Sequence, residues 1–131
     1  ETLVDDYQLG DAVIFTGWQS NLSAIYSDLD VSVVSSHHEE MPVSVIESLA
    51  AGCPVVATEV GGVPDLLNGG RLGTLVTPDD PHALATAIIS MVQSPPDIHE
   101  AQQTMLSTYS MNQLVNDMDS LYRGLLAKKR R

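Results

Sequence analysis

The sequence is poor in basic residues, and most of those it has lie at its C-terminal end. Six lysines and arginines stand against 17 aspartates and glutamates, for a formal net charge of −11. Before position 123, Arg71 is the only lysine or arginine. A protein that binds nucleic acid needs a basic surface to displace counterions from phosphates. The composition therefore excludes nucleic acid as a partner.

Cysteines and long hydrophobic runs are also scarce. Cys53 is the single cysteine, which excludes an internal disulfide and favours a reducing compartment. No run approaches the roughly 18 apolar residues of a membrane span. We therefore expect a cytoplasmic protein. The basic tail at residues 128–131 is interpreted either as a solubilising tail or as a contact with the inner face of a membrane. Because the sequence begins within a strand-and-helix pattern, we expect a piece of a longer protein.

Short β-branched runs alternate with longer helical patterns along the chain. Strands are predicted over residues 11–17, 30–36, 54–58 and 73–78. Helices are predicted over residues 20–29, 42–52, 64–70, 81–94, about 97–107 and about 110–128. This alternation predicts an α/β fold, a doubly wound parallel sheet of the Rossmann-like type in one unit. The strands lack a polar–apolar alternation, as expected where helices cover both faces.

Ligands of such sheets bind beyond the carboxyl ends of the strands. Three loops are expected at that edge: residues 17–20, 36–41 and 59–63. Directly after the second loop, Pro42 suits the first position of a helix, which leaves the amides of Val43 and Ser44 as free donors for an anion. Glu39 precedes this helix start, and Glu47 follows it by roughly 7–8 Å along the axis. This layout fits the sugar, phosphates and ribose of a nucleotide diphosphate sugar.

Several of these features also have a simpler interpretation. The glycines at 61 and 62 allow positive φ and close backbone approach, but they also occur in plain turns. His37 and His38 are interpreted as loop histidines rather than metal ligands, because no Cys or His stands at ligand spacing from them. Trp18 is expected either to cap the sheet edge or to line a pocket for the base. We expect no metal and no cofactor.

The spacing of these motifs resembles that of a known enzyme family. Glu39 and Glu47 with seven residues between them, then AGCPVVAT (51–58) and VGGVP (60–64), resemble the donor half of retaining GT-B glycosyltransferases of group 1. VIFTGW (13–18) and YSMNQLVNDMDSLYRGLL (109–126) match the family's upstream strand and closing helix. The resemblance implies that residues 1–131 are part of a C-terminal donor-binding domain, with 110–128 as a crossover helix.

The resemblance also implies roles for individual residues. Glu39 would be the catalytic residue that contacts the transferred sugar, and Glu47 would bind the ribose hydroxyls. The distal phosphate would be held by the backbone around four residues where the second loop meets the following helix, with two glycines nearby, and the base would border the first loop. These donor-binding residues are Met41, Pro42, Val43, Ser44, Gly61 and Gly62, with Gly17 and Trp18 at the base. The reaction implied is transfer of a hexose-type sugar with retention, usually without a bound metal.

Some positions depart from the family pattern. Glu40 and Met41 stand where glycine and phenylalanine are common, and Asp65 replaces a more usual glutamate. The arginine and lysine that normally neutralise the diphosphate, and the acceptor-binding half, are both absent. We therefore expect the chain alone to be inactive.

Two other functions are weighed against this one: a non-catalytic nucleotide-binding or interaction module of the same fold, and a nucleotide-sugar epimerase. The acceptor, a glycan, lipid or small molecule, is left open. The apolar positions Leu114, Met118, Leu121 and Leu125 are expected to face an absent partner, and so to allow self-association.

Overall fold

A parallel sheet forms the centre of the protein. The computed structural model describes residues 2–129. Its sheet has the strand order β1-β2-β3, with β1 at Ser32–Val34, β2 at Val55–Thr58 and β3 at Thr74–Val76. The strands pair in parallel, so that Val33 lies opposite Val56, and Ala57 opposite Leu75. The predicted α/β fold is confirmed, and three of the four predicted strands form within the predicted ranges.

Helices connect and cover the strands. They are α1 (Thr2–Asp6), α2 (Leu22–Asp28), α3 (Val43–Ala50), α4 (Val63–Leu66), α5 (Pro81–Gln93), α6 (His99–Thr108) and α7 (Met111–Lys129). Side chains cap α2 and α5, among others, because the amides of a first turn have no partner within the helix. The Asn21 side chain accepts a hydrogen bond from the amide of Ala24 at 3.4 Å, and Asp80 accepts one from Ala83 at 2.8 Å.

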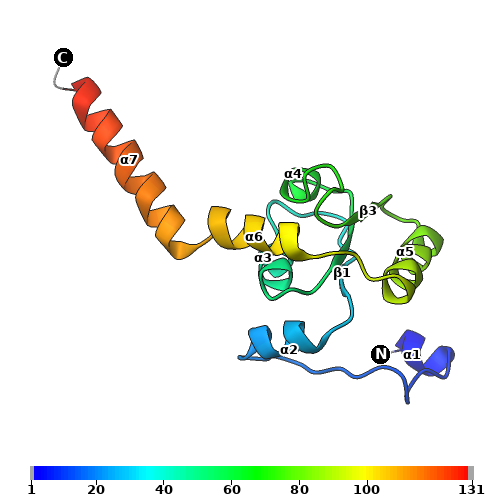
Figure 1. Cartoon of the computed structure of the whole chain (residues 1–131). Coiled ribbons are helices and arrows are strands. Elements are labelled where there is room, and N and C mark those ends of the chain that lie inside the picture. The colour runs from blue at the N-terminus through cyan, green and yellow to red at the C-terminus, as the bar shows by residue number, and fades with distance from the viewer. Residues whose placement is uncertain (1, 130–131) are drawn as a thin grey trace.

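The two faces of the sheet carry separate hydrophobic cores. Val55 and Ala57 of β2 pack in a cluster with side chains of α3, α4 and α6. Val56, which points the other way along the same strand, packs with Met91 of α5. Figure 1 shows α5 on the opposite side of the sheet from α3 and α4. Helices therefore lie on both faces of β2, as a doubly wound sheet requires.

The N-terminal segment departs from the prediction. Residues 11–17 form no strand and run beneath the sheet beside α2 (Figure 1). Strand backbone needs a neighbour to hydrogen-bond with, and in the described residues β1 pairs only with β2. The apolar residues of the segment are consequently exposed, with Ile14 at 85% and Phe15 at 59%. The strand predicted over 11–17 is thus wrong for this structure.

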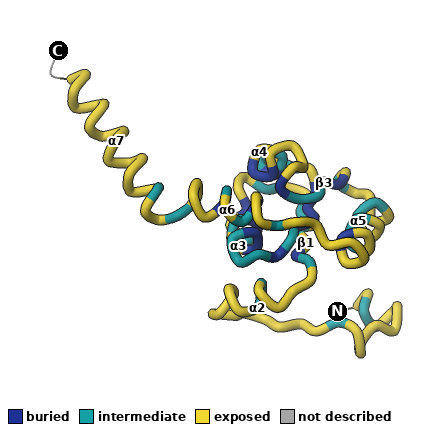
Figure 2. Tube along the Cα trace, viewed as in Figure 1, coloured by how far each residue is buried: buried dark blue, intermediate teal, exposed yellow. Residues whose placement is uncertain are grey.

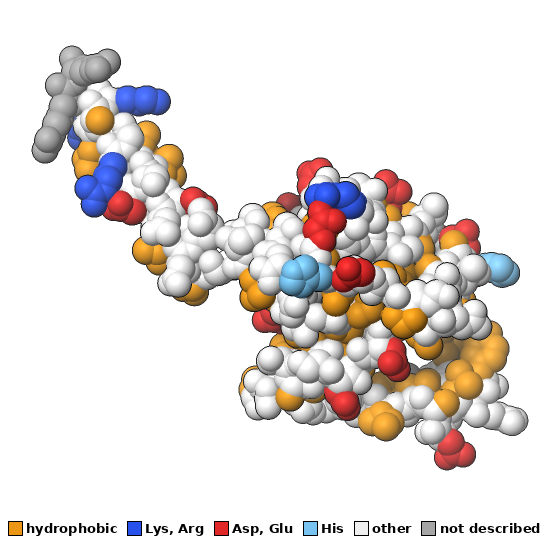
Figure 3. Space-filling view, viewed as in Figure 1, with side chains coloured by type: hydrophobic (Ala, Val, Ile, Leu, Met, Phe, Trp, Pro, Cys, Tyr) orange, Lys and Arg blue, Asp and Glu red, His pale blue; other side chains and the backbone are white. Residues whose placement is uncertain are grey.

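The last helix projects away from the rest of the molecule. α6 is held to the domain by Met105, which is buried in the core, and by Gln102, whose amide donates to the carbonyl of Ala50 at 3.1 Å. α7 extends beyond it and is exposed along most of its length (Figure 2). The space-filling view shows hydrophobic side chains along α7 (Figure 3). They include Leu114, Met118, Leu121 and Leu125, each between 40% and 55% exposed.

Two further expectations concern the basic C-terminal tail and a possible membrane span. Of the basic tail, Arg130 and Arg131 lie outside the described residues, as does Glu1. Over the part of the chain that is described, we find no helix with both the length and the apolar character needed to cross a membrane.

Candidate functional site

Two loops at the carboxyl edge of the sheet lie against each other. The loop after β1 carries Glu39 and Glu40, and the loop after β2 carries Gly61 and Gly62. A Cβ on Gly61 would overlap the carbonyl oxygen of Glu39, and a Cβ on Gly62 would overlap that of Glu40. Gly61 also has φ = +51°, a conformation that L side chains rarely adopt. This close approach explains why glycines occupy both positions, and it brings two of the three predicted loops together.

Hydrogen bonds fix the shape of the loop that carries Glu39. The Thr58 hydroxyl, at the end of β2, donates to the carbonyl oxygen of Ser36 at 2.5 Å and lies 3.3 Å from that of Val34. The Ser36 hydroxyl in turn donates to Oε1 of Glu39 at 2.7 Å. The Glu39 side chain is therefore held by its own loop. Sequence reasoning missed Ser36 and Thr58. The available signal was a polar residue ending an otherwise apolar, buried strand.

The start of α3 differs from the prediction by one residue. Pro42 is the N-cap, with an extended backbone (ψ = 111°), and not the first helical residue. Its carbonyl oxygen accepts a hydrogen bond from the amide of Val45 at 3.1 Å, so the helix begins at Val43. No side chain in the described residues caps this end. Val43 and Ser44 thus occupy the first two helical positions, where amides have no intrahelical partner. Met41 is exposed beside them.

Glu47 lies on the exposed side of α3 and not inside the core. It lines a hollow of about 320 Å³ together with Tyr26 of α2 and Leu106 of α6. The pKa of the Tyr26 hydroxyl is raised, chiefly by burial, next by the Glu47 charge and then by Cys53. An exposed position needs no ion pair to compensate for desolvation. Solvent exposure therefore accounts for a carboxylate on this otherwise apolar helix.

The first loop is not part of this arrangement. The turn that holds Gly17 and Trp18 lies beside the start of α2, well separated from the loops after β1 and β2 (Figure 1). Trp18 is 88% exposed, so it neither caps the sheet nor lines a pocket here. The expectation that loop 17–20 lies at the carboxyl edge is wrong for this structure. The reason is that residues 11–17 form no strand and so do not place the following loop at that edge.

Charged groups at the carboxyl edge are mostly acidic. His37 Nδ1 lies 3.2 Å from Asp79 Oδ1, which links the loops after β1 and β3. His38 Nε2 lies 3.8 Å from Glu40 Oε1. Arg71 instead forms an ion pair with Glu100 of α6 and lies in the turn that leads into β3, at the opposite edge of the sheet. It is therefore not placed to neutralise an anion at the start of α3.

Comparison with known proteins identifies the class. The family profile of glycosyl transferases group 1 matches residues 1–94, well over half of the chain. The chain therefore belongs to this family. A lipopolysaccharide core biosynthesis mannosyltransferase of Rhizobium meliloti is 31% identical over 106 residues, which are 79% of this chain and 30% of the relative. A D-inositol 3-phosphate glycosyltransferase of Catenulispora acidiphila is 40% identical over 77 residues, or 59% of this chain and 18% of the relative.

Solved structures share the fold over nearly the whole chain. The sucrose-phosphate synthase of Thermosynechococcus elongatus superposes with a TM-score of 0.88 at 33% identity, covering 97% of this chain and 33% of that one. The Anabaena protein HepE, solved in complex with UDP, superposes with a TM-score of 0.87 at 20% identity, covering 94% and 35% respectively. The chain thus has the fold of part of a GT-B glycosyltransferase, and spans about a third of these neighbours.

Proposed function

We propose that the chain is the C-terminal, donor-binding part of a larger glycosyltransferase that transfers a hexose-type sugar from a nucleotide diphosphate sugar with retention. The observation that carries this proposal is the contact between the Gly61–Gly62 turn and the backbone of Glu39 and Glu40. It forms one backbone-lined site next to the uncapped start of α3. Family membership supports sugar transfer as the chemistry.

Each part of the donor has a partner in this proposal. The diphosphate binds the amides of Val43 and Ser44, because the positive end of a helix dipole favours an anion. Glu39 is the catalytic residue and contacts the transferred sugar, while Glu47 accepts hydrogen bonds from the ribose hydroxyls. Glycines at 61 and 62 let the backbone come close to the phosphate. The base pocket around Gly17 and Trp18 requires residues 11–17 to join the sheet beside β1 in the whole protein.

Neutralising charge has to come from other parts of the proposed enzyme. A diphosphate at the start of α3 would meet Glu39, Glu40 and Asp79 at the same edge, whereas Arg71 is paired with Glu100 elsewhere. Developing charge on the leaving diphosphate requires stabilisation by cations or oriented dipoles. In the proposed enzyme, cations from the preceding part of the donor domain supply it.

The apolar face of α7 is explained by the same proposal. In the whole enzyme this helix crosses to the acceptor-binding half. Contact with that half covers the leucines that are exposed on α7 here. In the isolated chain, the same face leads to self-association. Action in the cytoplasm, or at the inner face of a membrane, stays a prediction from composition.

Replacing Glu47 with glutamine in the full-length protein tests the ribose contact. We expect the dissociation constant of whichever donor binds, UDP-glucose or GDP-mannose, to rise about tenfold, because hydrogen bonds to a charged group contribute about 1.5–3 kcal/mol. Isothermal titration calorimetry measures this. Glu59→Gln is the matched control, since it removes the same charge from the exposed carboxyl edge but no proposed ribose contact. Equal affinity in the Glu47→Gln protein and the parent would contradict the assigned role.

The 131-residue chain by itself is expected to transfer no sugar. It spans only about a third of its structural neighbours, and its described residues place no free lysine or arginine near the proposed phosphate site. Release of nucleoside diphosphate from UDP-glucose or GDP-mannose, with and without acceptor mixtures, measures this. Turnover by the pure chain above a no-protein blank would sink the proposal that it is only part of the catalytic unit.

A further inference from the structure

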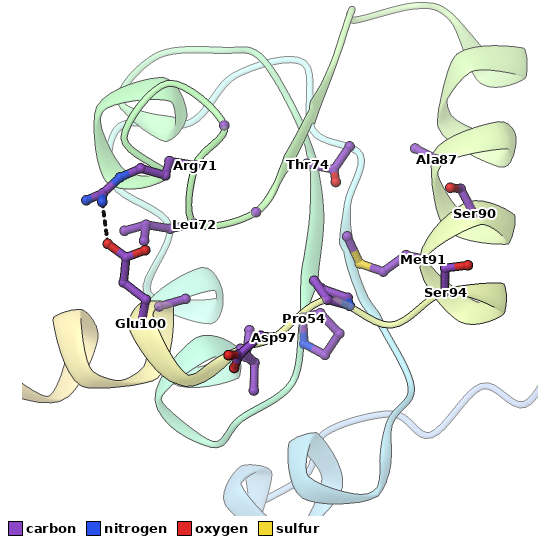
Figure 4. Close-up of a pocket in the computed structure, with 15 residues that line it drawn as sticks. Pro54, Arg71, Leu72, Thr74, Ala87, Ser90, Met91, Ser94, Asp97 and Glu100 are labelled. Atoms are coloured by element: carbon purple, nitrogen blue, oxygen red, sulfur yellow. Dashed lines mark hydrogen bonds and ion pairs between the residues drawn. The ribbon is translucent and has the colours of Figure 1, made fainter.

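A second cavity lies at the amino edge of the sheet, away from the proposed donor site. It has a volume of about 270 Å³. Pro54, just before β2, and Thr74, the first residue of β3, lie on its sheet side, and the C-terminal half of α5 and the start of α6 close it. Figure 4 shows these elements around the opening. Ligands of open α/β sheets bind at the carboxyl edge, so the donor site does not account for this cavity.

The walls of the cavity combine an apolar floor with hydroxyl groups. Leu72 and Met91 are 6% and 7% exposed and form part of the floor. Thr74 projects from β3, Ser90 from α5, and Ser94 from the position directly after the end of α5 (Figure 4). None of these three hydroxyls makes a side-chain hydrogen bond to another described residue, unlike Ser36 or Thr58. A hydroxyl can both donate and accept, so they are available to a ligand that does the same.

The charges around the cavity select against anions. Arg71, its only cationic lining residue in the described chain, forms an ion pair with Glu100 (Figure 4). Asp97, whose Oδ1 accepts a hydrogen bond from the amide of His99 at 2.9 Å, adds a negative charge that forms no ion pair with the described residues. The lining therefore carries a net charge of −1 from these groups, in a chain of net charge −11. A phosphate or carboxylate would be repelled, whereas a neutral hydroxyl can donate to Asp97.

From this geometry we propose that the amino-edge cavity binds a neutral sugar ring. A pyranose presents a C–H face to Leu72 and Met91 and hydroxyls to Thr74, Ser90 and Asp97. The cavity lies just below the range of about 300–1,000 Å³ for drug-sized ligands, which suits one ring and not a nucleotide sugar. This sugar site is separate from the proposed donor site, so it does not depend on the function proposed above.

Titration of the 131-residue chain with methyl α-D-glucopyranoside tests this site. We expect saturable shifts of the Thr74, Ser90 and Ser94 amide signals in ¹⁵N–¹H NMR spectra, with a dissociation constant on the order of 1 mM. Ser94→Trp places a large side chain at an exposed lining position, and should weaken binding at least about tenfold. Ser107→Trp is the matched control on an exposed turn of α6 outside the cavity, and should leave affinity unchanged.

Three results would overturn the proposal. The first is the absence of saturable shifts up to about 20 mM sugar, some twenty times the expected dissociation constant. The second is equal affinity of the parent and the Ser94→Trp variant. The third is saturable shifts of the same amides with inorganic phosphate but none with the sugar, which would identify an anion site at Arg71 instead.

Discussion

Replacing Gly61 with alanine is expected to lower the free energy of unfolding by about 3 kcal/mol. About 1 kcal/mol comes from the left-handed conformation, since φ is +51°. The rest comes from displacing the backbone of Glu39, whose carbonyl oxygen occupies the space a Cβ would take, and such overpacking costs about 1–3 kcal/mol. Urea denaturation, followed by circular dichroism and analysed by linear extrapolation, measures the loss.

Gly69→Ala is the matched control for this substitution. Gly69 has a similar φ of +64°, but a Cβ there meets nothing within 4 Å. It should therefore lose only about 1 kcal/mol, the cost of the backbone conformation alone. The difference between the two variants measures the contact between the loops after β1 and β2. Equal losses would mean that this contact is absent in solution, and the proposed donor site would lose its main support.

Replacing Glu39 with glutamine in the full-length protein is expected to lower kcat at least about 100-fold. Losses of about this size follow when an enzyme loses one group that stabilises its transition state. The amide keeps the size of the side chain and its bond from Ser36, so the loop should keep its shape. Donor affinity should change little, because the phosphate and ribose contacts lie elsewhere. Initial rates with the donor that binds, over a range of donor concentrations, separate kcat from KM.

Glu40→Gln is the control for Glu39→Gln. Glu40 is the adjacent acid and is exposed, and its carboxylate is 3.8 Å from His38. Exposed ion pairs contribute little, so its loss should change kcat by no more than about twofold. If both variants kept full activity, the catalytic assignment would fail, and the non-catalytic nucleotide-binding module would become the better account of this site. If both lost activity equally, general charge near the diphosphate would be the cause.

Local sequence was sufficient for most of the helices. The helix predicted over residues 81–94 matches α5, where Asp80 is the N-cap. The helical spacing of Leu84, Ile88 and Met91 predicts its buried side; Met91 is buried, and the other two pack partly buried beside it. Two separate helices after residue 96 were also predicted and confirmed. Helix signals are local because capping and periodicity act within a few residues.

The failures lie where distant segments have to meet. Residues 11–17 have the β-branched composition of a strand, yet a strand exists only with a partner to pair with. The same failure removes Gly17 and Trp18 from the carboxyl edge. Pro42 was placed one residue too far into α3, because the choice between cap and first turn depends on ψ and not on residue type.

The sequence by itself determined the class of fold and the family, because the order of β-branched runs, caps and glycines is a property of the chain read in one dimension. The spacing along the chain also singled out Glu39, Glu47 and the glycine pair as candidate site residues. Only the tertiary structure decided that Gly61 and Gly62 press against the Glu39–Glu40 backbone, that Arg71 pairs with Glu100 at the opposite edge, and that Glu47 faces solvent beside Tyr26. These are contacts between residues brought together by sheet pairing and helix packing, which no local pattern encodes.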